Sequence, residues 1–129
     1  MTTKELGQLG EKLACEYLVK KGYKILGKNY RINFGEIDII AKKKWRLFIE
    51  KTIHFVEVKA LVDNGYNIAP EEHVDARKKR KLRQMAQIWL QKNRYKQAYP
   101  HQIDVMGILV NEKTKNAKLH YFGNVVEDL

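Results

Sequence analysis

The sequence feature that most constrains this chain is a short apolar stretch, 53–59 (IHFVEVK), interrupted by two opposite charges. Its β-branched and aromatic residues predict a strand. Because strand side chains alternate between faces, Glu57 and Lys59 share one face with Phe55. Two charges on an apolar strand are costly unless they pair or bind something. The stretch is therefore either an ordinary Glu–Lys ion pair on a wet face or a carboxylate beside a catalytic lysine.

A second acid interrupts the apolar stretch 36–41 (EIDIIA), which also predicts a strand. Aspartate is depleted in strands, so Asp38 between two isoleucines requires an explanation. If this strand pairs with 53–59, Asp38 and Glu57 lie side by side on one face. Two carboxylates that close raise each other's pKa unless a cation bridges them. Oxygen ligands favour a hard ion, so the pair predicts Mg²⁺ or Mn²⁺.

The segment 4–21 carries apolar residues at helical spacing and predicts a helix. Glu11 lies in it on a stripe of small and apolar residues, with Gly7, Ala14 and Leu18. An acid flanked by small residues can approach a neighbouring sheet closely, where it can add a metal ligand. The alternative is a partly exposed glutamate whose stem covers the edge of the core.

The net charge of +10 is concentrated in one segment, 74–96, which holds nine Lys/Arg and one acid. Most of this segment belongs to a second predicted helix, 71–95, on whose apolar face Lys78 lies between Val74 and Leu82. Clustered cations are typical of phosphate-binding surfaces, so we expect a nucleic acid partner. The alternative is a solvated, lysine-rich helix. The expected contacts in this helix are Arg77, Lys78, Arg80, Lys81 and Arg83.

Composition narrows the class of protein. A length of 129 residues fits one domain, 1–129, with its own core. The apolar runs are too short to cross a bilayer, and the polar N-terminal residues carry no signal-peptide pattern, so no membrane association is expected. The single cysteine, Cys15, excludes an internal disulfide and fits the reducing cytoplasm.

The remaining segments predict three further strands and a hairpin. Asp104 is one more acid among apolar neighbours, and Trp45, Leu47, Phe48 and Ile49 are expected to be partly buried. The order of helix, three strands, helix and two strands predicts an α/β (α+β) fold with one mixed sheet. The further segments are strands at 23–30, 102–110 and 119–122, a hairpin at 42–52 and a tail at 125–129.

The spacing of Asp38, eighteen residues, Glu57, one residue and Lys59 resembles the core motif of the PD-(D/E)xK nucleases. The whole chain resembles the YraN-like family of endonuclease-like proteins, which is related in fold to Holliday-junction resolvases. That resemblance depends on Gly10-Glu11 with Ala14 and Leu18, Gly22-Tyr23, Asn29-Tyr30-Arg31, Gly35-Glu36-Ile37-Asp38, Phe55-Val56-Glu57-Val58-Lys59, Val74 with Lys78 and Leu82, and Asp104-Val105.

The resemblance implies a restriction-endonuclease-like core, with a mixed sheet of about five strands flanked by helices. It implies a metal site at Asp38 and Glu57, assistance from Glu11, and Lys59 as the catalytic lysine. Arg31 adds to the expected nucleic-acid-binding surface.

The activity implied is metal-dependent hydrolysis of phosphodiester bonds in DNA, including branched DNA, by a cytoplasmic endonuclease. The alternative is a non-catalytic nucleic-acid-binding module on the same fold. Two cuts on a symmetric junction need two sites, so the resolvase resemblance also implies a homodimer. Leu61 departs from the family pattern, which has an arginine there, and this removes positive charge near the expected substrate path.

Overall fold

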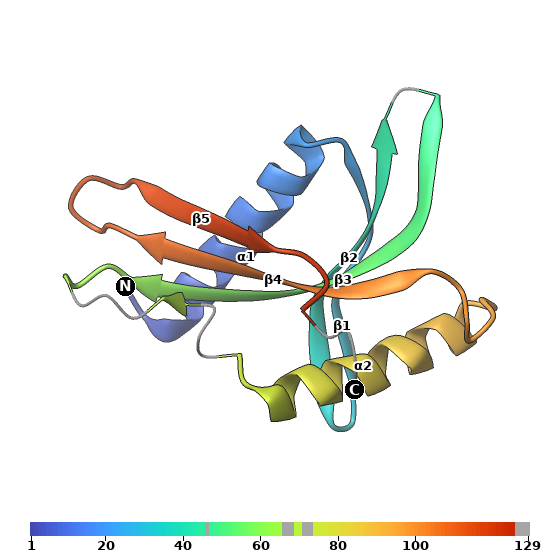
Figure 1. Ribbon diagram of the computed structural model, residues 1–129. Coiled ribbons are helices and arrows are strands. Elements are labelled where there is room, and N and C mark those ends of the chain that lie inside the picture. Colours follow the sequence, from blue (N-terminus) through green and yellow to red (C-terminus); the bar gives the residue numbers. More distant parts are fainter. Residues whose placement is uncertain (46, 66–68, 71–73, 126–129) are drawn as a thin grey trace.

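The computed structural model describes residues 1–45, 47–65, 69–70 and 74–125 (Figure 1). The predicted helix start at 71–73 and the predicted tail at 126–129 lie outside these residues. The observed order of elements confirms the predicted α+β fold. The elements are α1 (Thr3–Lys20), β1 (Tyr23–Ile32), β2 (Gly35–Trp45), β3 (Phe48–Val62), α2 (Ala76–Lys92), β4 (His101–Val110) and β5 (Ala117–Phe122).

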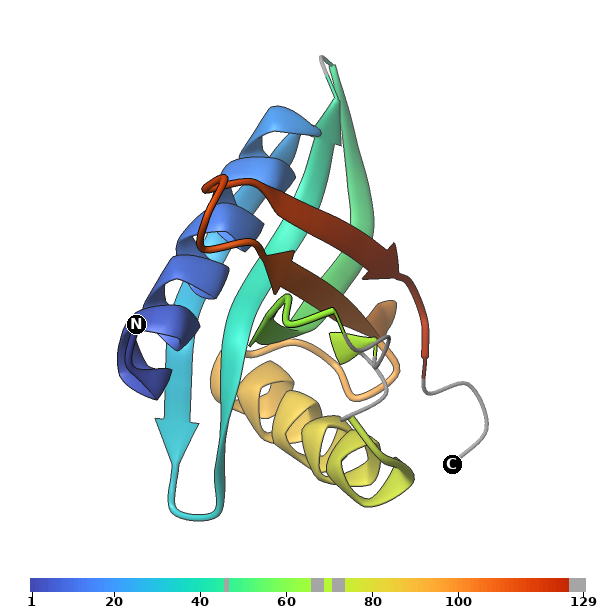
Figure 2. The ribbon, with the colours of Figure 1, turned by 90° about the vertical axis from the view of Figure 1, so that its left-hand side faces the viewer.

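The five strands form one mixed sheet in the order β1-β2-β3-β4-β5. Neighbouring strands are antiparallel except β3 and β4, which are parallel and are connected through α2. A parallel pair requires such a crossover, because a tight turn cannot bring the chain back to the same end. In Figure 2, α1 and α2 lie on either side of β2. This arrangement is that of a restriction-endonuclease-like core.

Each face of the sheet packs against one helix, as strand alternation requires. On one face, Phe55 belongs to an apolar cluster that contains Trp89 of α2. On the other face, its neighbour Val56 packs with Ala14 and Leu18 of α1. The charges at positions 57 and 59 therefore interrupt a strand that is covered on both sides.

The sheet forks between β2 and β3. The β2–β3 ladder runs from the hairpin to the pair Ile39–Val56. Beyond that pair, among the described strands, β2 continues to Gly35 beside β1, and β3 continues to Val62 beside β4. Figure 1 shows the β1–β2 hairpin turning away from β3 and β4. Side chains at the fork can therefore be reached from the layers of both helices.

The predicted hairpin within 42–52 is present, but the burial expected for its apolar residues is wrong. Leu47, Phe48 and Ile49 are 97%, 78% and 60% exposed. The ends of β2 and β3 project beyond both helices (Figures 1 and 2), so no helix covers these side chains. The side chain of Trp45 lies outside the described part of the structure.

The second helix is shorter than the predicted 71–95, since it spans Ala76–Lys92. Asp75 caps it, because its carboxylate accepts a hydrogen bond from the backbone N–H of Lys78 at 2.9 Å. Val74 is buried, as predicted, but it precedes the helix. Within the described residues, no helix combines the length and apolar character needed to cross a membrane.

Asp104, the acid within β4, is fully buried and belongs to a structural network. It accepts from Gln102 Nε2 at 2.7 Å, Asn124 N at 2.8 Å and the Tyr121 hydroxyl, and it contacts His54 Nδ1 at 2.7 Å. Burial alone would raise the pKa of Asp104, but these partners together hold it below its ordinary value. The carboxylate thereby ties β3, β4 and β5 together.

Candidate functional site

Asp38 and Glu57 meet at the fork, as the predicted strand pairing requires. Continuing the β2–β3 register by one residue from Ile39–Val56 sets Asp38 opposite Glu57. The backbone N–H of Val58, beyond the end of the ladder, donates to Asp38 Oδ2 at 2.7 Å. The aspartate side chain thus satisfies a strand donor where the neighbouring strand departs.

The first helix brings Glu11 to the same place because Gly10 allows a close approach. A Cβ atom at Gly10 would lie 2.7 Å from the Cβ of Ala60 on β3. Only a glycine permits α1 to pack so tightly on the strand at this point. The predicted close approach of this helix face is therefore present, and Glu11 is the next residue along the chain.

Three carboxylates converge from α1 and β2. One oxygen each from Glu11, Glu36 and Asp38 lies within 4.8 Å of the others, a group that can hold a metal ion. We call these three residues the acidic cluster. Sequence reasoning did not include Glu36 among the site residues. Glu36 and Asp38 are two residues apart on a strand and therefore share one face, and this spacing is the sequence signal for Glu36.

Asn29 of β1 braces the acidic cluster. With its amide nitrogen turned toward the carboxylates, it donates to both oxygens of Glu11 at 3.1 Å and to Glu36 Oε1 at 2.8 Å. Its φ of 50° lies in the left-handed region, which asparagine tolerates better than most residues. The strained backbone thus places a donor between two acids from different elements.

The surroundings of the acidic cluster disfavour the charged form of its carboxylates. Burial and the nearby charge of Glu57 raise the pKa of Asp38 to about 8, against the opposing hydrogen bond from Val58. Burial also raises the pKa of Glu11, in spite of its hydrogen bond with Asn29. Adjacent carboxylates in such surroundings favour either a shared proton or a bound cation. The oxygen-only donor set suits a hard divalent ion.

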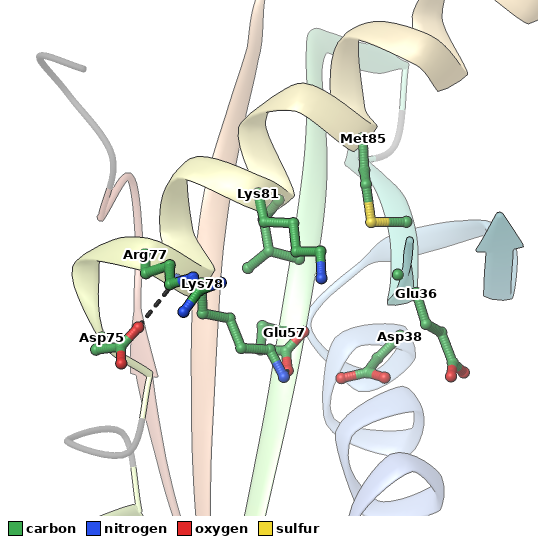
Figure 3. A pocket seen from close by; sticks show the side chains of 10 residues that line it. Glu36, Asp38, Glu57, Asp75, Arg77, Lys78, Lys81 and Met85 are labelled. Atoms are coloured by element: carbon green, nitrogen blue, oxygen red, sulfur yellow. Dashed lines mark hydrogen bonds and ion pairs between the residues drawn. The ribbon is translucent and has the colours of Figure 1, made fainter. Parts of the chain in front are cut away.

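Glu57 is turned toward α2 and pairs with a lysine there. It is 6% exposed, and its Oε1 lies 2.8 Å from Lys78 Nζ (Figure 3). Burial raises the pKa of Glu57, and the ammonium offsets that effect only in part. The lysine that falls on the apolar face of the helix therefore brings its ammonium to Glu57, while its side chain stays 52% exposed.

Lys59 lies two residues beyond Glu57 on the same strand and is partly buried. Within the described residues it forms no ion pair within 4.0 Å and does not line the cleft beside Glu57. Its charge still lowers the pKa of Glu57, although less than Lys78 does. The cation in direct contact with Glu57 is thus Lys78 rather than Lys59.

A cleft of about 400 Å³ lies between α2 and the fork (Figure 3). Acids from β2 and β3 form one wall, and cations from α2 form the other. Arg80 and Arg83 belong to α2 but lie outside the lining, and Arg31 pairs with Glu36 at 3.1 Å. The charged lining residues include Glu36, Asp38, Glu57, Arg77, Lys78 and Lys81.

A forked, mixed sheet with helices on both faces and carboxylates at the fork defines a restriction-endonuclease-like α+β domain. Residues 10–108 match the model of the uncharacterised protein family UPF0102. The chain belongs to this family, which confirms the YraN-like resemblance of its sequence.

Several bacterial relatives are similar over most of their length. A UPF0102 protein of Clostridioides difficile is 41% identical over 124 residues, covering 95% of this chain and 100% of that protein. One from Caldanaerobacter subterraneus is 38% identical, covering 94% and 93%. One from Thermodesulfovibrio yellowstonii is 43% identical, covering 84% and 88%. Their names state no activity, so the inference about function depends on the site.

Proposed function

We propose that this protein is a Mg²⁺- or Mn²⁺-dependent endonuclease that hydrolyses phosphodiester bonds in DNA. The observation that supports this most directly is the acidic cluster, with three carboxylate oxygens within 4.8 Å at the edge of a cleft with a basic wall. A site that holds a cation beside lysines and arginines suits a polyanionic substrate. A cytoplasmic homodimer, expected from the resolvase resemblance, belongs to the same proposal, and light scattering tests the dimer.

The acidic cluster would hold the ion, and Glu57 would join it if Lys78 moved to the substrate. A bound divalent ion supplies Lewis-acid activation of the phosphoryl group and of the attacking water. Lys78, with its ammonium 2.8 Å from Glu57, is placed to stabilise negative charge that develops on the phosphoryl oxygens. Arg77 and Lys81, on the same cleft wall, would bind neighbouring phosphates.

Calorimetric titration with Mn²⁺ tests the metal site. We expect a binding isotherm in the parent protein that Asp38→Asn abolishes, since the amide keeps the shape of the side chain and loses its charge. Glu5→Gln is the matched control, because Glu5 is an exposed acid on α1 outside the acidic cluster. Absence of Mn²⁺ binding in the parent would contradict the proposal.

Cleavage is assayed on linear, flapped and four-way DNA, with an RNA strand of the same sequence for comparison. We expect Mg²⁺- or Mn²⁺-dependent products from DNA and none with Asp38→Asn. Lys59→Gln and Lys78→Gln are compared in the same assay, and a greater loss with Lys78→Gln supports the role assigned to Lys78. Products that persist in Asp38→Asn would indicate a different site or a contaminant.

A second candidate is a non-catalytic nucleic-acid-binding module on the same fold. The Lys78–Glu57 pair favours it, because the ammonium already neutralises one of the proposed ligands. This candidate predicts salt-dependent binding of DNA without cleavage on any of the substrates, even when Mn²⁺ binds. The cleavage assay therefore separates the two functions.

A further inference from the structure

A second cleft, of about 440 Å³, lies between α1 and β1. It is lined by residues from one face of α1 and by two consecutive residues of β1. None of its lysines belongs to the basic segment around α2. The lining includes Glu11, Lys12, Cys15, Lys28 and Asn29.

The two clefts meet at the acidic cluster. Glu11 lines the second cleft, whereas Glu36 and Asp38 line the first, and the three carboxylates lie within 4.8 Å. Asn29 lines the second cleft and donates to both Glu11 and Glu36. A ligand that extends across the acidic cluster from one cleft therefore enters the other.

The second cleft carries its own cations. Lys12 and Lys28 are exposed, and within the described residues neither forms an ion pair within 4.0 Å. Burial raises the pKa of Cys15; the charge of Lys28 opposes this rise, and the charges of Glu11 and Glu16 add to it. In the described lining these two lysines balance two acids, Glu16 and Glu11 of the acidic cluster.

We propose that the two clefts form one path for a single strand of nucleic acid, with Lys12 and Lys28 binding phosphates across the acidic cluster from Arg77 and Lys81. This inference rests on the proposed function. A phosphodiester held at the acidic cluster has neighbouring phosphates on both sides, and each is repelled by the carboxylates unless a cation is near. Clefts of these volumes fit ligands of nucleotide size rather than a whole duplex.

The single cysteine of the chain provides a direct test, because Cys15 lines the second cleft. The alkylation rate of the full-length protein with N-ethylmaleimide is measured with and without saturating oligothymidylate, in Ca²⁺, with binding followed by fluorescence anisotropy. We expect bound oligonucleotide to slow alkylation of Cys15 about fivefold or more, since thiol reactivity follows access.

The control moves the thiol to the other side of the same helix. In the double variant Cys15→Ser/Lys20→Cys, the new thiol replaces an exposed side chain that lies about 140° around the helix from Cys15 and outside the lining of the second cleft. We expect its alkylation rate to be unchanged by oligonucleotide. Equal protection of both thiols would indicate general shielding and would overturn the assignment of the cleft.

Charge neutralisation tests the two lysines. The double variant Lys12→Gln/Lys28→Gln should reduce the slope of log affinity against log salt by about 1.4, since each phosphate contact to a single strand contributes about 0.7. Lys20→Gln/Lys24→Gln is the matched control, because it makes the same charge change on α1 and β1 outside the cleft. Equal changes in slope for the two variants would contradict the path.

The outcomes separate this inference from the proposed function. If the parent binds and cleaves DNA while Cys15 stays unprotected and both lysine pairs behave alike, the path is wrong and the proposed function stands. If the parent binds no nucleic acid, both are wrong. Protection of Cys15 without any cleavage supports the path and assigns it to a binding module.

Discussion

Because α1 packs closely on β3 at Gly10 but not at Gly7, we expect alanine to have opposite effects on stability at these two glycines. An alanine at an exposed helical position stabilises a protein by about 0.5–1 kcal/mol relative to glycine. A Cβ atom added at Gly7 would meet no neighbouring atom within 4 Å, so Gly7→Ala should show that gain. At Gly10 the added Cβ would lie 2.7 Å from Ala60 Cβ, well inside the contact distance of about 3.5–4.0 Å between carbon atoms.

The clash at Gly10 should outweigh the helix propensity of alanine. The Cβ of Ala60 is fixed to the strand backbone and cannot rotate away, so the helix itself must retreat by about 1 Å. Overpacking of this kind costs about 1–3 kcal/mol. When the gain in helix propensity is subtracted from this cost, we expect Gly10→Ala to lower the free energy of unfolding by up to about 2 kcal/mol. The two alanine variants should thus differ by about 1–3 kcal/mol.

Urea unfolding followed by tryptophan fluorescence, in EDTA at pH 7, measures both free energies. The double variant Gly10→Ala/Ala60→Gly completes a thermodynamic cycle, and removing the opposing methyl group should recover about 1 kcal/mol or more beyond the sum of the single effects. Retreat of α1 also carries Glu11 away from Asp38, so Gly10→Ala should weaken Mn²⁺ binding while Gly7→Ala does not. The packing argument is refuted if Gly10→Ala stabilises the protein as much as Gly7→Ala, or if the coupling is zero.

Three further predictions concern other parts of the fold. Asp104→Asn should be destabilised most, relative to the parent, at neutral pH, and this difference should shrink as the pH falls below about 4. The pKa of Asp104 is lowered in the folded protein, so its stabilising effect is present above the unfolded pKa and is lost in acid. Acid titration of the two proteins measures the difference. Gly35→Ala should lower the free energy of unfolding by less than about 1 kcal/mol, because the atom 2.7 Å from its new Cβ is the sulfur of the flexible Met85 side chain. Urea unfolding measures this loss, and a larger value would contradict the prediction. Leu47→Ser should change the free energy of unfolding by less than about 0.5 kcal/mol, since that side chain is 97% exposed, and a larger loss in the same experiment would mean that the hairpin end is packed.

The strand pairing that creates the site could be predicted because both strands carry their signals locally. Asp38 and Glu57 each interrupt a β-branched stretch, and a hairpin segment connects the two stretches in the chain. Such a pair of neighbouring strands is antiparallel by default. The register that sets Asp38 beside Glu57 then follows from the apolar faces, because a slip of one residue would expose the core.

Contacts between elements that are distant in the chain could not be predicted from the sequence. The choice of Lys78 over Lys59 as the partner of Glu57 depends on how α2 lies across the sheet, and no local pattern specifies that angle. Glu36 was missed because its alternation with Asp38 gives a shared face but not the distance to Glu11. The start of α2 was placed too early because Asp75 was counted among the acids of the first turn, whereas its side chain caps the helix.

The fork of the sheet explains why one site receives opposite charges from two helices on opposite faces. In a continuous sheet, α1 and α2 would be separated by a full layer of strand, and neither could reach the other's side chains. Where β2 leaves β3, that layer is interrupted, so Glu11 approaches Asp38 from one side and Lys78 approaches Glu57 from the other. The interruption also frees a backbone donor, the N–H of Val58, which Asp38 satisfies. The aspartate is therefore both the structural end of the β2–β3 ladder and the central carboxylate of the site, so a substitution that preserves its acceptor and removes its charge, Asp38→Asn, separates the two roles.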